Sequence, residues 1–292
     1  MLADADRYFV LGNPVAHSQS PFIHQAFAQQ TGQRLIYDRR WCPMDGFEAA
    51  VRALAGDTEG GRVRGCNVTV PFKFEVPALA RVLTPRAALA QAANVLRFDA
   101  DGWLADNTDG IGLMRDLQQH EGLDLRGREV LVIGAGGAAA GVLGALLECS
   151  PARVHVANRS PARAEALVAR HATLAQAHSV ALTAGALDAL SSGAIPAFDL
   201  WINASASSLA GAASPAPAVV MAPGAVVVDL MYGAAAEPFL AWARTQGASR
   251  TVDGLGMLVE QAAEAFFLWR GVRPQTAPVL AALRERLRAA TP

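Results

Sequence analysis

A short segment at residues 67–73, Asn-Val-Thr-Val-Pro-Phe-Lys, places one lysine just after a β-branched stretch and a proline. The β-branched residues 68–70 predict a strand, and Pro71 should end it because proline removes a hydrogen-bond donor and fixes φ. We then expect Phe72 to be buried and Lys73 to project from the strand end, where ligands bind in open α/β sheets. A lysine held there can donate a proton and stabilise developing negative charge. A lone lysine more simply reaches solvent, so the neighbouring polar groups decide between the two interpretations.

An aspartate that could pair with this lysine lies in residues 107–110, Asn-Thr-Asp-Gly, before a helix expected over 111–120. Taken alone, Asp109 is a helix N-cap or a first-turn acid. Beside a lysine in a binding site, it becomes the second half of a Lys–Asp proton-transfer pair, in which the titration of each group depends on the other. Asn94, at the start of an expected strand, could donate to a hydroxyl or merely shape a turn.

Two hydroxyls, those of Ser18 and Ser20, alternate in the loop that opens a helix expected over 21–30. Hydroxyls together with free helix N–H groups suit a carboxylate. The simpler interpretation is that Ser20 is the N-cap and Pro21 the first helical residue, which explains one of the two hydroxyls.

A glycine-rich turn follows a buried strand at residues 130–139, Val-Leu-Val-Ile-Gly-Ala-Gly-Gly-Ala-Ala. Gly134 allows the tight turn, Gly136 lets the backbone approach a pyrophosphate, and Ala139 takes the third small position. The phosphates would lie at the N-terminus of the next helix, where free N–H groups and the helix dipole favour anions. In this strand–turn–helix context the pattern predicts a dinucleotide site, although such a turn can also serve close helix–strand packing alone.

The end of the next strand indicates which nicotinamide cofactor binds. An acidic residue there would hold the ribose 2′-hydroxyl of NAD, but the chain has Asn-Arg-Ser-Pro-Ala-Arg at residues 158–163. Arg159 and Arg163 can surround a 2′-phosphate, and cations at a helix N-terminus are otherwise slightly disfavoured. We therefore expect NADP; the alternative is two solvated arginines.

The composition is that of a globular protein with a large core. The 292 residues are 52% hydrophobic and 17% charged, and the net charge is −1, which argues against nucleic-acid binding and a basic membrane patch. Three widely spaced cysteines suggest reduced thiols in a cytoplasmic protein. No signal peptide is apparent, and glycines interrupt the longest apolar run, residues 130–147. His17 and His24 lack the spacing of metal ligands, so no metal is expected.

The chain shows alternating short apolar runs and amphipathic segments, which predicts parallel βαβ units. Residues 93–98 and 103–105 should form a hairpin, and the Ala-rich residues 210–218 a loop. Further strands are expected over 8–12, 35–37, 129–133, 154–157, 200–203 and 226–229, and further helices over 47–54, 136–149, 161–170, 256–270 and 276–289.

These motifs, in this order, resemble the shikimate dehydrogenase family over essentially the whole chain. Residues 67–73 and 107–110 are the most specific matches, whereas the glycine loop is shared with many families. The other matching segments are residues 12–14, 17–21, 93–94, 134–138 and 158–163, Asp229 with Tyr232, and 253–258 with Gln261. The resemblance implies an oxidoreductase that reduces 3-dehydroshikimate to shikimate with NADPH, the fourth step of the shikimate pathway to chorismate and the aromatic amino acids.

The resemblance also implies roles for individual residues. Lys73 and Asp109 would be the catalytic pair and also contact the substrate. The remaining substrate-binding residues would be Ser18 and Ser20 at the carboxylate, Thr69, Asn94 and Gln261 at the ring hydroxyls, and Tyr232. The cofactor-binding residues would be Gly134, Ala135, Gly136, Gly137 and Ala138 at the pyrophosphate, Asn158, Arg159, Ser160 and Arg163 at the 2′-phosphate, and Leu230 and Gly254 near the nicotinamide.

The expected architecture is α/β, with an N-terminal substrate-binding α/β domain, a Rossmann-like NADP-binding domain, and C-terminal helices that return to the first domain. We place the substrate-binding domain at residues 1–110 and 256–292 and the NADP-binding domain at 111–255, with the active site in a cleft between them. The expected partner is a small-molecule substrate, with no nucleic acid and no membrane, and the protein would be a monomer or homodimer.

Two segments depart from the family pattern. Residues 203–208, Asn-Ala-Ser-Ala-Ser-Ser, replace the usual Asn-Ala-Thr-Ser-Ser-Gly, and Pro85 stands where an acidic residue is common. Three alternatives remain open. An NAD-dependent quinate/shikimate dehydrogenase should carry an acid in place of the pair at 158–159. A non-catalytic NADP-binding regulatory homologue should lack Lys73 or Asp109. A folate-type dehydrogenase would share the glycine loop but not residues 107–110.

Overall fold

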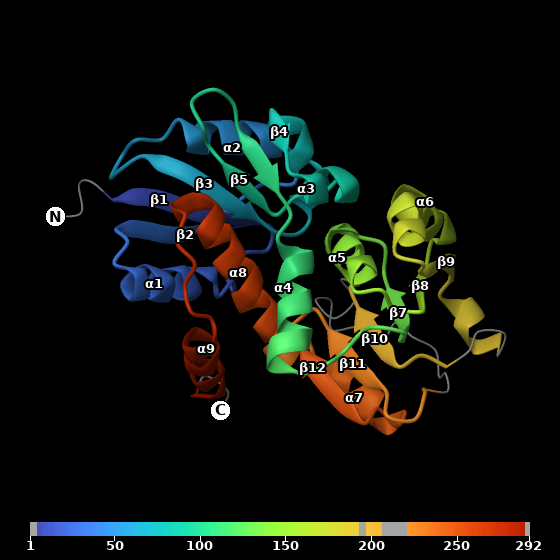
Figure 1. Ribbon diagram of the computed structural model, residues 1–292. Helices are drawn as coiled ribbons and strands as arrows, with labels where there is room; N and C mark the ends of the chain where they lie inside the picture. Colours follow the sequence, from blue (N-terminus) through green and yellow to red (C-terminus); the bar gives the residue numbers. More distant parts are fainter. Residues whose placement is uncertain (1–4, 193–196, 206–220, 290–292) are drawn as a thin grey trace. The chain divides into compact units, whose positions relative to one another are not determined.

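The computed structural model describes residues 5–192, 197–205 and 221–289 (Figure 1). The expected loop at 210–218 and the departure at residues 206–208 lie outside this part of the chain. The chain divides into two compact units, Met1–Gly112 with Leu258–Pro292, and Leu113–Met257. Each unit contains one sheet with helices, so the expected α/β fold class is confirmed.

The first unit has a six-stranded mixed sheet with the order β2-β1-β3-β5-β6-β4. β1 is parallel to β2 and β3, whereas β5 is antiparallel to β3 and β6, which confirms the expected hairpin. The strands are β1 Asp6–Gly12, β2 Leu35–Trp41, β3 Val63–Val68, β4 Val82–Leu83, β5 Val95–Arg97 and β6 Leu104–Asp106. The helices are α1 Ser20–Thr31, α2 Phe47–Ala55, α3 Pro85–Ala90 and α9 Ala277–Ala289, together with parts of α4 Asp109–Arg115 and α8 Leu255–Arg270, within which the division of the chain falls.

The sheet of the first unit is covered on both faces, as the sequence of β1 requires. Successive side chains of a strand point to opposite faces, and those of β1 are apolar on both. Phe9 and Leu11 pack in the cluster that includes residues of α2, and Tyr8 and Val10 pack in the cluster that Trp269 of α8 joins. Phe72 is fully buried on the α2 side, as expected.

The second unit has six parallel strands with the order β12-β11-β10-β7-β8-β9. The order reverses at β7, and this is the doubly wound arrangement in which ligands bind at the carboxyl ends of the strands beside the reversal point. The strands are β7 Glu129–Ile133, β8 Arg153–Asn158, β9 Ala181–Ala186, β10 Leu200–Asn203, β11 Val226–Asp229 and β12 Arg250–Asp253. The helices are α5 Gly137–Glu148, α6 Pro161–Ala177 and α7 Glu237–Thr245.

The start of α1 differs from the expectation that Ser20 is its N-cap. The helix begins at Ser20, Gln19 is the N-cap residue, and Gln19 makes no side-chain capping bond. The backbone N–H of Ser20 donates to Ser18 Oγ at 3.3 Å. The prediction of Ser20 as the N-cap is therefore wrong by one residue, and the hydroxyl that accepts from this turn belongs to Ser18.

The strand before the lysine also differs from the expected 68–70. β3 ends at Val68, whose register partner on β1 is Leu11. The chain turns immediately afterwards, where the N–H of Phe72 donates to the carbonyl of Thr69 at 3.1 Å. The lysine lies in the short 3₁₀ turn Phe72–Phe74 that follows.

Several other element boundaries were misjudged. The expected helix over 111–120 is α4 followed by a π-helical turn, Asp116–His120, and α6 is longer than 161–170. The strands β9 and β12 and the helix α7 had not been expected. Within the described residues no helix is long and apolar enough to cross a membrane.

Candidate functional site

The predicted Lys–Asp pair forms within the first unit. Lys73 Nζ lies 2.6 Å from Asp109 Oδ2, and the two side chains are 14% and 5% exposed. The lysine is held by its turn, since the ring of Phe72 stacks on that of Phe47 at 4.8 Å. Asp109 is the first residue of α4, where a carboxylate is favoured by the helix dipole. A nearly buried ammonium in contact with a carboxylate can give and regain a proton without exposure to bulk water.

Asn94 connects Asp109, at the start of α4, to Gln261 of α8. Its Nδ2 lies 2.9 Å from Asp109 Oδ1, 3.0 Å from Thr108 Oγ1 and 3.1 Å from Gln261 Oε1, and its Oδ1 accepts the backbone N–H of Thr108 at 2.8 Å. Asp109 thus accepts from an ammonium on one oxygen and from an amide on the other. The structure therefore brings together four of the predicted site residues: Lys73, Asn94, Asp109 and Gln261.

The two predicted carboxylate-binding hydroxyls are also in contact. Ser18 Oγ donates to Ser20 Oγ at 3.2 Å at the start of α1. Arg39 Nε, which no sequence motif had marked, donates to the carbonyl of Ser18 at 2.9 Å. This guanidinium fixes the loop that carries the hydroxyls and contributes positive charge beside them. Thr69 is half-buried next to Gly12, where a Cβ would lie 2.4 Å from the Thr69 methyl group.

The glycine turn of the second unit has a geometry that suits a dinucleotide. Gly134 has a φ of +108°, and a Cβ there would lie 3.0 Å from the backbone nitrogen of Ser205, so the position demands glycine. Gly136 is the N-cap of α5, and a Cβ placed on it would meet nothing within 4 Å. Open space at a helix N-terminus suits a phosphate group. Ala139 is fully buried, as the third small position requires.

The two arginines expected at a 2′-phosphate lie just after β8. Both Arg159 and Arg163 are exposed, and neither pairs with a carboxylate in the described parts of the chain. Asn158 Nδ2 and the backbone N–H of Arg163 both donate to the carbonyl of Ser160, at 2.9 Å and 3.1 Å, which fixes the turn between them. Unpaired guanidiniums on a fixed turn fit an anionic ligand.

Two other predicted cofactor residues, Leu230 and Gly254, meet at the carboxyl ends of the strands of this sheet. The N–H of Gly254 donates to the carbonyl of Met231 at 2.8 Å, and a Cβ on Gly254 would lie 2.3 Å from the carbonyl oxygen of Leu230. Gly254 therefore permits close approach of the ends of β11 and β12. Tyr232 is half-buried after β11 in this second unit, whereas the other predicted substrate residues belong to the first.

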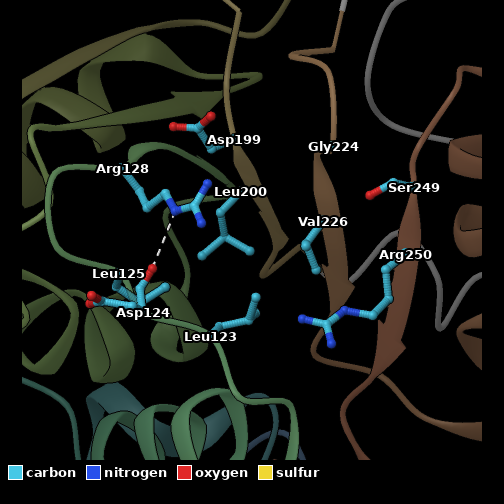
Figure 2. Close-up of a pocket in the computed structure, with 10 residues that line it drawn as sticks. All are labelled: Leu123, Asp124, Leu125, Arg128, Asp199, Leu200, Gly224, Val226, Ser249 and Arg250. Atoms are coloured by element: carbon cyan, nitrogen blue, oxygen red, sulfur yellow. Dashed lines mark hydrogen bonds between the residues drawn. The ribbon is translucent and has the colours of Figure 1, made fainter.

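A cavity of about 320 Å³ occurs in the second unit at the amino ends of its parallel strands. Figure 2 shows Leu200, Val226 and Arg250, the first residues of β10, β11 and β12, around it. Because the glycine turn follows the carboxyl end of β7, this cavity is not the predicted cofactor site.

Comparison with known proteins identifies the chain. Three family models match it: the shikimate dehydrogenase substrate binding domain at residues 10–96, the shikimate/quinate 5-dehydrogenase at residues 116–210, and the shikimate 5′-dehydrogenase C-terminal domain at residues 254–284. Shikimate dehydrogenase (NADP(+)) of Methylibium petroleiphilum is 60% identical over 284 residues, which are 97% of this chain and 95% of the relative. The chain belongs to the shikimate dehydrogenase family.

Another relative and two solved structures extend this likeness. The enzyme of the same name from Acidovorax sp. is 57% identical and covers 99% of each chain. The crystal structure of shikimate 5-dehydrogenase from Thermus thermophilus in complex with NADP(H) and shikimate has a TM-score of 0.78 at 30% identity, covering 96% of this chain and 99% of that one. The Ael1 enzyme from Pseudomonas putida has a TM-score of 0.82 at 43% identity, covering 96% and 98%. The expectations of an oxidoreductase and of NADP as its cofactor are confirmed.

Proposed function

We propose that this shikimate dehydrogenase family member catalyses the reversible, NADPH-dependent reduction of 3-dehydroshikimate to shikimate, the fourth step towards chorismate and the aromatic amino acids. Support comes from the names of its relatives and from the crystal complex of a family member with NADP(H) and shikimate. The observation that carries the proposal is the nearly buried contact between Lys73 and Asp109.

The composition of the chain supports a proton-transfer role for this lysine. Lys73 is the only lysine among the 25 residues that are Lys or Arg. An arginine can replace a lysine where only positive charge is needed, but its guanidinium does not give up a proton in proteins. A lysine at this one position therefore fits a requirement for a removable proton.

The reaction follows from these groups. Bound NADPH supplies the hydride that reaches the ketone carbon. Lys73 donates a proton to the ketone oxygen, and its charge stabilises the alkoxide that develops there. Asp109 orients Lys73, and in the reverse direction the pair takes up the proton of the alcohol. Asn94 holds the other oxygen of Asp109, so that the carboxylate cannot rotate away from the lysine.

We propose the remaining roles on the same basis, with residues 1–110 and 256–292 as the substrate-binding domain and 111–255 as the NADP-binding domain. In the first, Ser18 and Ser20 bind the substrate carboxylate, and Thr69, Asn94 and Gln261 hold ring hydroxyls. Tyr232 is a further proposed substrate-binding residue. The pyrophosphate binds at residues 134–138, the 2′-phosphate at Asn158, Arg159, Ser160 and Arg163, and the nicotinamide near Leu230 and Gly254.

A spectrophotometric assay tests this function, with NADP⁺ and NAD⁺ each combined with shikimate and with quinate. The proposal predicts that NADP⁺ with shikimate has the highest kcat/KM of the four combinations. A preference for NAD⁺ or for quinate would instead identify a quinate/shikimate dehydrogenase. Absence of turnover in all four combinations would support a non-catalytic homologue.

A further inference from the structure

A cluster of buried polar side chains lies in the first unit between the two parts of the proposed substrate site. We call Ser20, His24, Tyr37 and Asn67 the Tyr37 cluster; they come from α1, β2 and β3 and are 5%, 1%, 9% and 6% exposed. Burial of polar groups is costly unless each finds a partner. A cluster of this kind beside a binding site therefore requires an explanation beyond core packing.

The phenol of Tyr37 is the centre of the cluster. Its hydroxyl donates to Asn67 Oδ1 at 2.6 Å, and Asn67 Nδ2 donates to the carbonyl of Asn94 at 3.2 Å. Burial raises the pKa of Tyr37 well above its ordinary value, and the Cys66 thiol adds to this, while the nearby Ser20 hydroxyl opposes it. The phenol is therefore a neutral donor that reaches Asn94 through Asn67, and its ring packs against His24 of the helix that carries Ser20.

His24 supports this tyrosine from the helix that carries Ser20. Positions 20 and 24 share one face of α1, four residues apart. The His24 and Tyr37 rings stack at 4.1 Å with an interplanar angle of 3°. Burial lowers the pKa of His24 to about 3, with the Asn67 amide acting in the opposite direction, so the imidazole is neutral. The stacked rings hold Tyr37 in place independently of its hydroxyl.

We infer that Tyr37 is a positioning residue that fixes the distance between the carboxylate-binding hydroxyl of Ser20 and the amide of Asn94. This rests on the proposed function, in which one substrate molecule contacts Ser20 with its carboxylate and Asn94 with a ring hydroxyl. Holding both groups at a fixed separation before binding removes an ordering cost from each encounter. Without its hydroxyl, the ring still stacks on His24, but Asn67 loses its donor and the connection between the two ends is broken.

The chain offers a matched control for this hydroxyl. Tyr8 is the register partner of Tyr37 on the neighbouring strand β1 and is also buried. Its ring stacks on Trp269 at 4.6 Å, and its hydroxyl accepts from Arg270 Nη1 at 3.4 Å. Tyr8→Phe therefore removes a buried hydroxyl from the same sheet and leaves the hydrogen bond between Tyr37 and Asn67 in place.

Steady-state kinetics of Tyr37→Phe and Tyr8→Phe test the inference. We expect Tyr37→Phe to raise KM for shikimate roughly tenfold, because one buried hydrogen bond is lost and its acceptor is left unpaired. The kcat should fall less than about threefold. The KM for NADP⁺ should not change, and Tyr8→Phe should stay within about twofold of the parent for both substrates. An unchanged KM for shikimate in Tyr37→Phe overturns the inference.

Two further measurements distinguish a positioning role of Tyr37 from a general loss of rigidity in the substrate site. With the carboxamide of shikimate, which lacks the carboxylate charge, Tyr37→Phe should lower kcat/KM by less than about twofold. In a cycle with Ser20→Ala, the double variant should have nearly the KM of Ser20→Ala alone. The inference is overturned if Tyr37→Phe lowers kcat/KM equally for shikimate and its carboxamide, or if the effects of Tyr37→Phe and Ser20→Ala on KM are fully additive. A normal KM in Ser20→Ala would overturn the proposed carboxylate site as well, whereas an effect in Ser20→Ala without one in Tyr37→Phe refutes the positioning role alone.

Discussion

The two units of this protein build their sites in opposite ways. In the first unit, side chains from the turn after β3, the start of β5, the start of α4 and α8 converge on one hydrogen-bonded network around Asn94. In the second unit, the candidate cofactor residues are mainly backbone positions and exposed arginines at the carboxyl ends of parallel strands. Substitutions in the first site should therefore be severe and strongly coupled, whereas those in the second should be milder and nearly independent.

The largest effect is expected for Lys73 and Asp109, the proposed catalytic pair. Lys73→Ala and Asp109→Ala should each lower kcat by a general acid–base factor of about 10²–10⁴, with a smaller change in KM for shikimate. Because the two groups act as a unit, the double variant should lose little more than either single one. Steady-state kinetics of the three variants check this, and fully additive losses would show two independent roles.

A buried ion-pair network should make the first unit sensitive to one structural arginine. Arg86 Nε lies 2.7 Å from Asp106 Oδ1, and its Nη2 lies 3.2 Å from Glu264 Oε1; the side chains are 37%, 1% and 10% exposed. Arg86→Ala leaves a buried carboxylate without its main partner, so the free energy of unfolding should fall by about 3 kcal/mol, the lower end for a buried pair because the arginine is partly exposed.

The control for Arg86 is Arg97→Ala in the same unit. Arg97 pairs with Asp99 at 2.9 Å, but both side chains are about one-third exposed, at 35% and 32%. Its loss should cost no more than about 1 kcal/mol. Urea unfolding of both variants measures the difference, and equal losses would mean that burial of the Arg86 pair does not matter.

Cofactor preference should depend on the exposed arginines of the second unit. Arg159→Ala should weaken NADP⁺ binding by about 1.5–3 kcal/mol through loss of charge-assisted bonds to the 2′-phosphate, and the use of NAD⁺ should barely change. Arg126→Ala, which removes another exposed arginine of this unit, is the control. If Arg159→Ala weakens the binding of NADP⁺ and NAD⁺ equally, the arginine has a structural role and does not select the cofactor.

A smaller effect concerns the acid stability of the first unit. The pKa of His24 is about 3 in the folded protein, against 6.5 as the reference value for the unfolded chain. The unfolded state therefore binds the proton first as pH falls. The contribution of neutral His24 is fully present above about pH 6.5 and is lost at about 1.4 kcal/mol per pH unit between pH 6.5 and 3.

His24→Phe keeps an aromatic ring against Tyr37 and removes the titrating group. The free energy of unfolding of this variant should fall less between pH 7 and 5.5 than that of the parent, by about 1.4 kcal/mol. The comparison must be between slopes, because His155 and His171 in the second unit also have lowered pKa values caused by burial. Identical slopes in the two proteins would show that His24 does not contribute.

The sequence predicted three interior strands of the second unit to the residue. β7, β10 and β11 are continuous apolar runs because both of their faces are buried. The edge strands β9 and β12 were missed, since Arg250-Thr-Val-Asp and Ala181-Leu-Thr-Ala lack such runs. The end of β3 was misplaced by two residues because the β-branched pattern of residues 68–70 does not report where the chain turns. The turn begins at Thr69, whose carbonyl accepts from the N–H of Phe72.

The candidate site likewise combines residues that the sequence predicted with residues that it did not. Lys73 and Asp109 could be paired from sequence because each lies in a distinctive motif, and the structure places their side chains in contact. Nothing marked Tyr37 or Arg39, which occupy ordinary positions in a strand. Their contacts with Asn67 and Ser18 depend on how α1, β2 and β3 pack, so only the folded chain reveals them.

The turnover number of Lys73→Arg tests the central claim most directly. Arginine keeps the positive charge beside Asp109 but cannot give up its proton, so this one substitution separates proton transfer from electrostatic stabilisation. If Lys73 is the proton donor, kcat with shikimate and NADP⁺ should fall by at least about 10², while the KM for NADP⁺ stays close to that of the parent. A kcat within a few-fold of the parent would contradict a proton-transfer role for the only lysine in the chain.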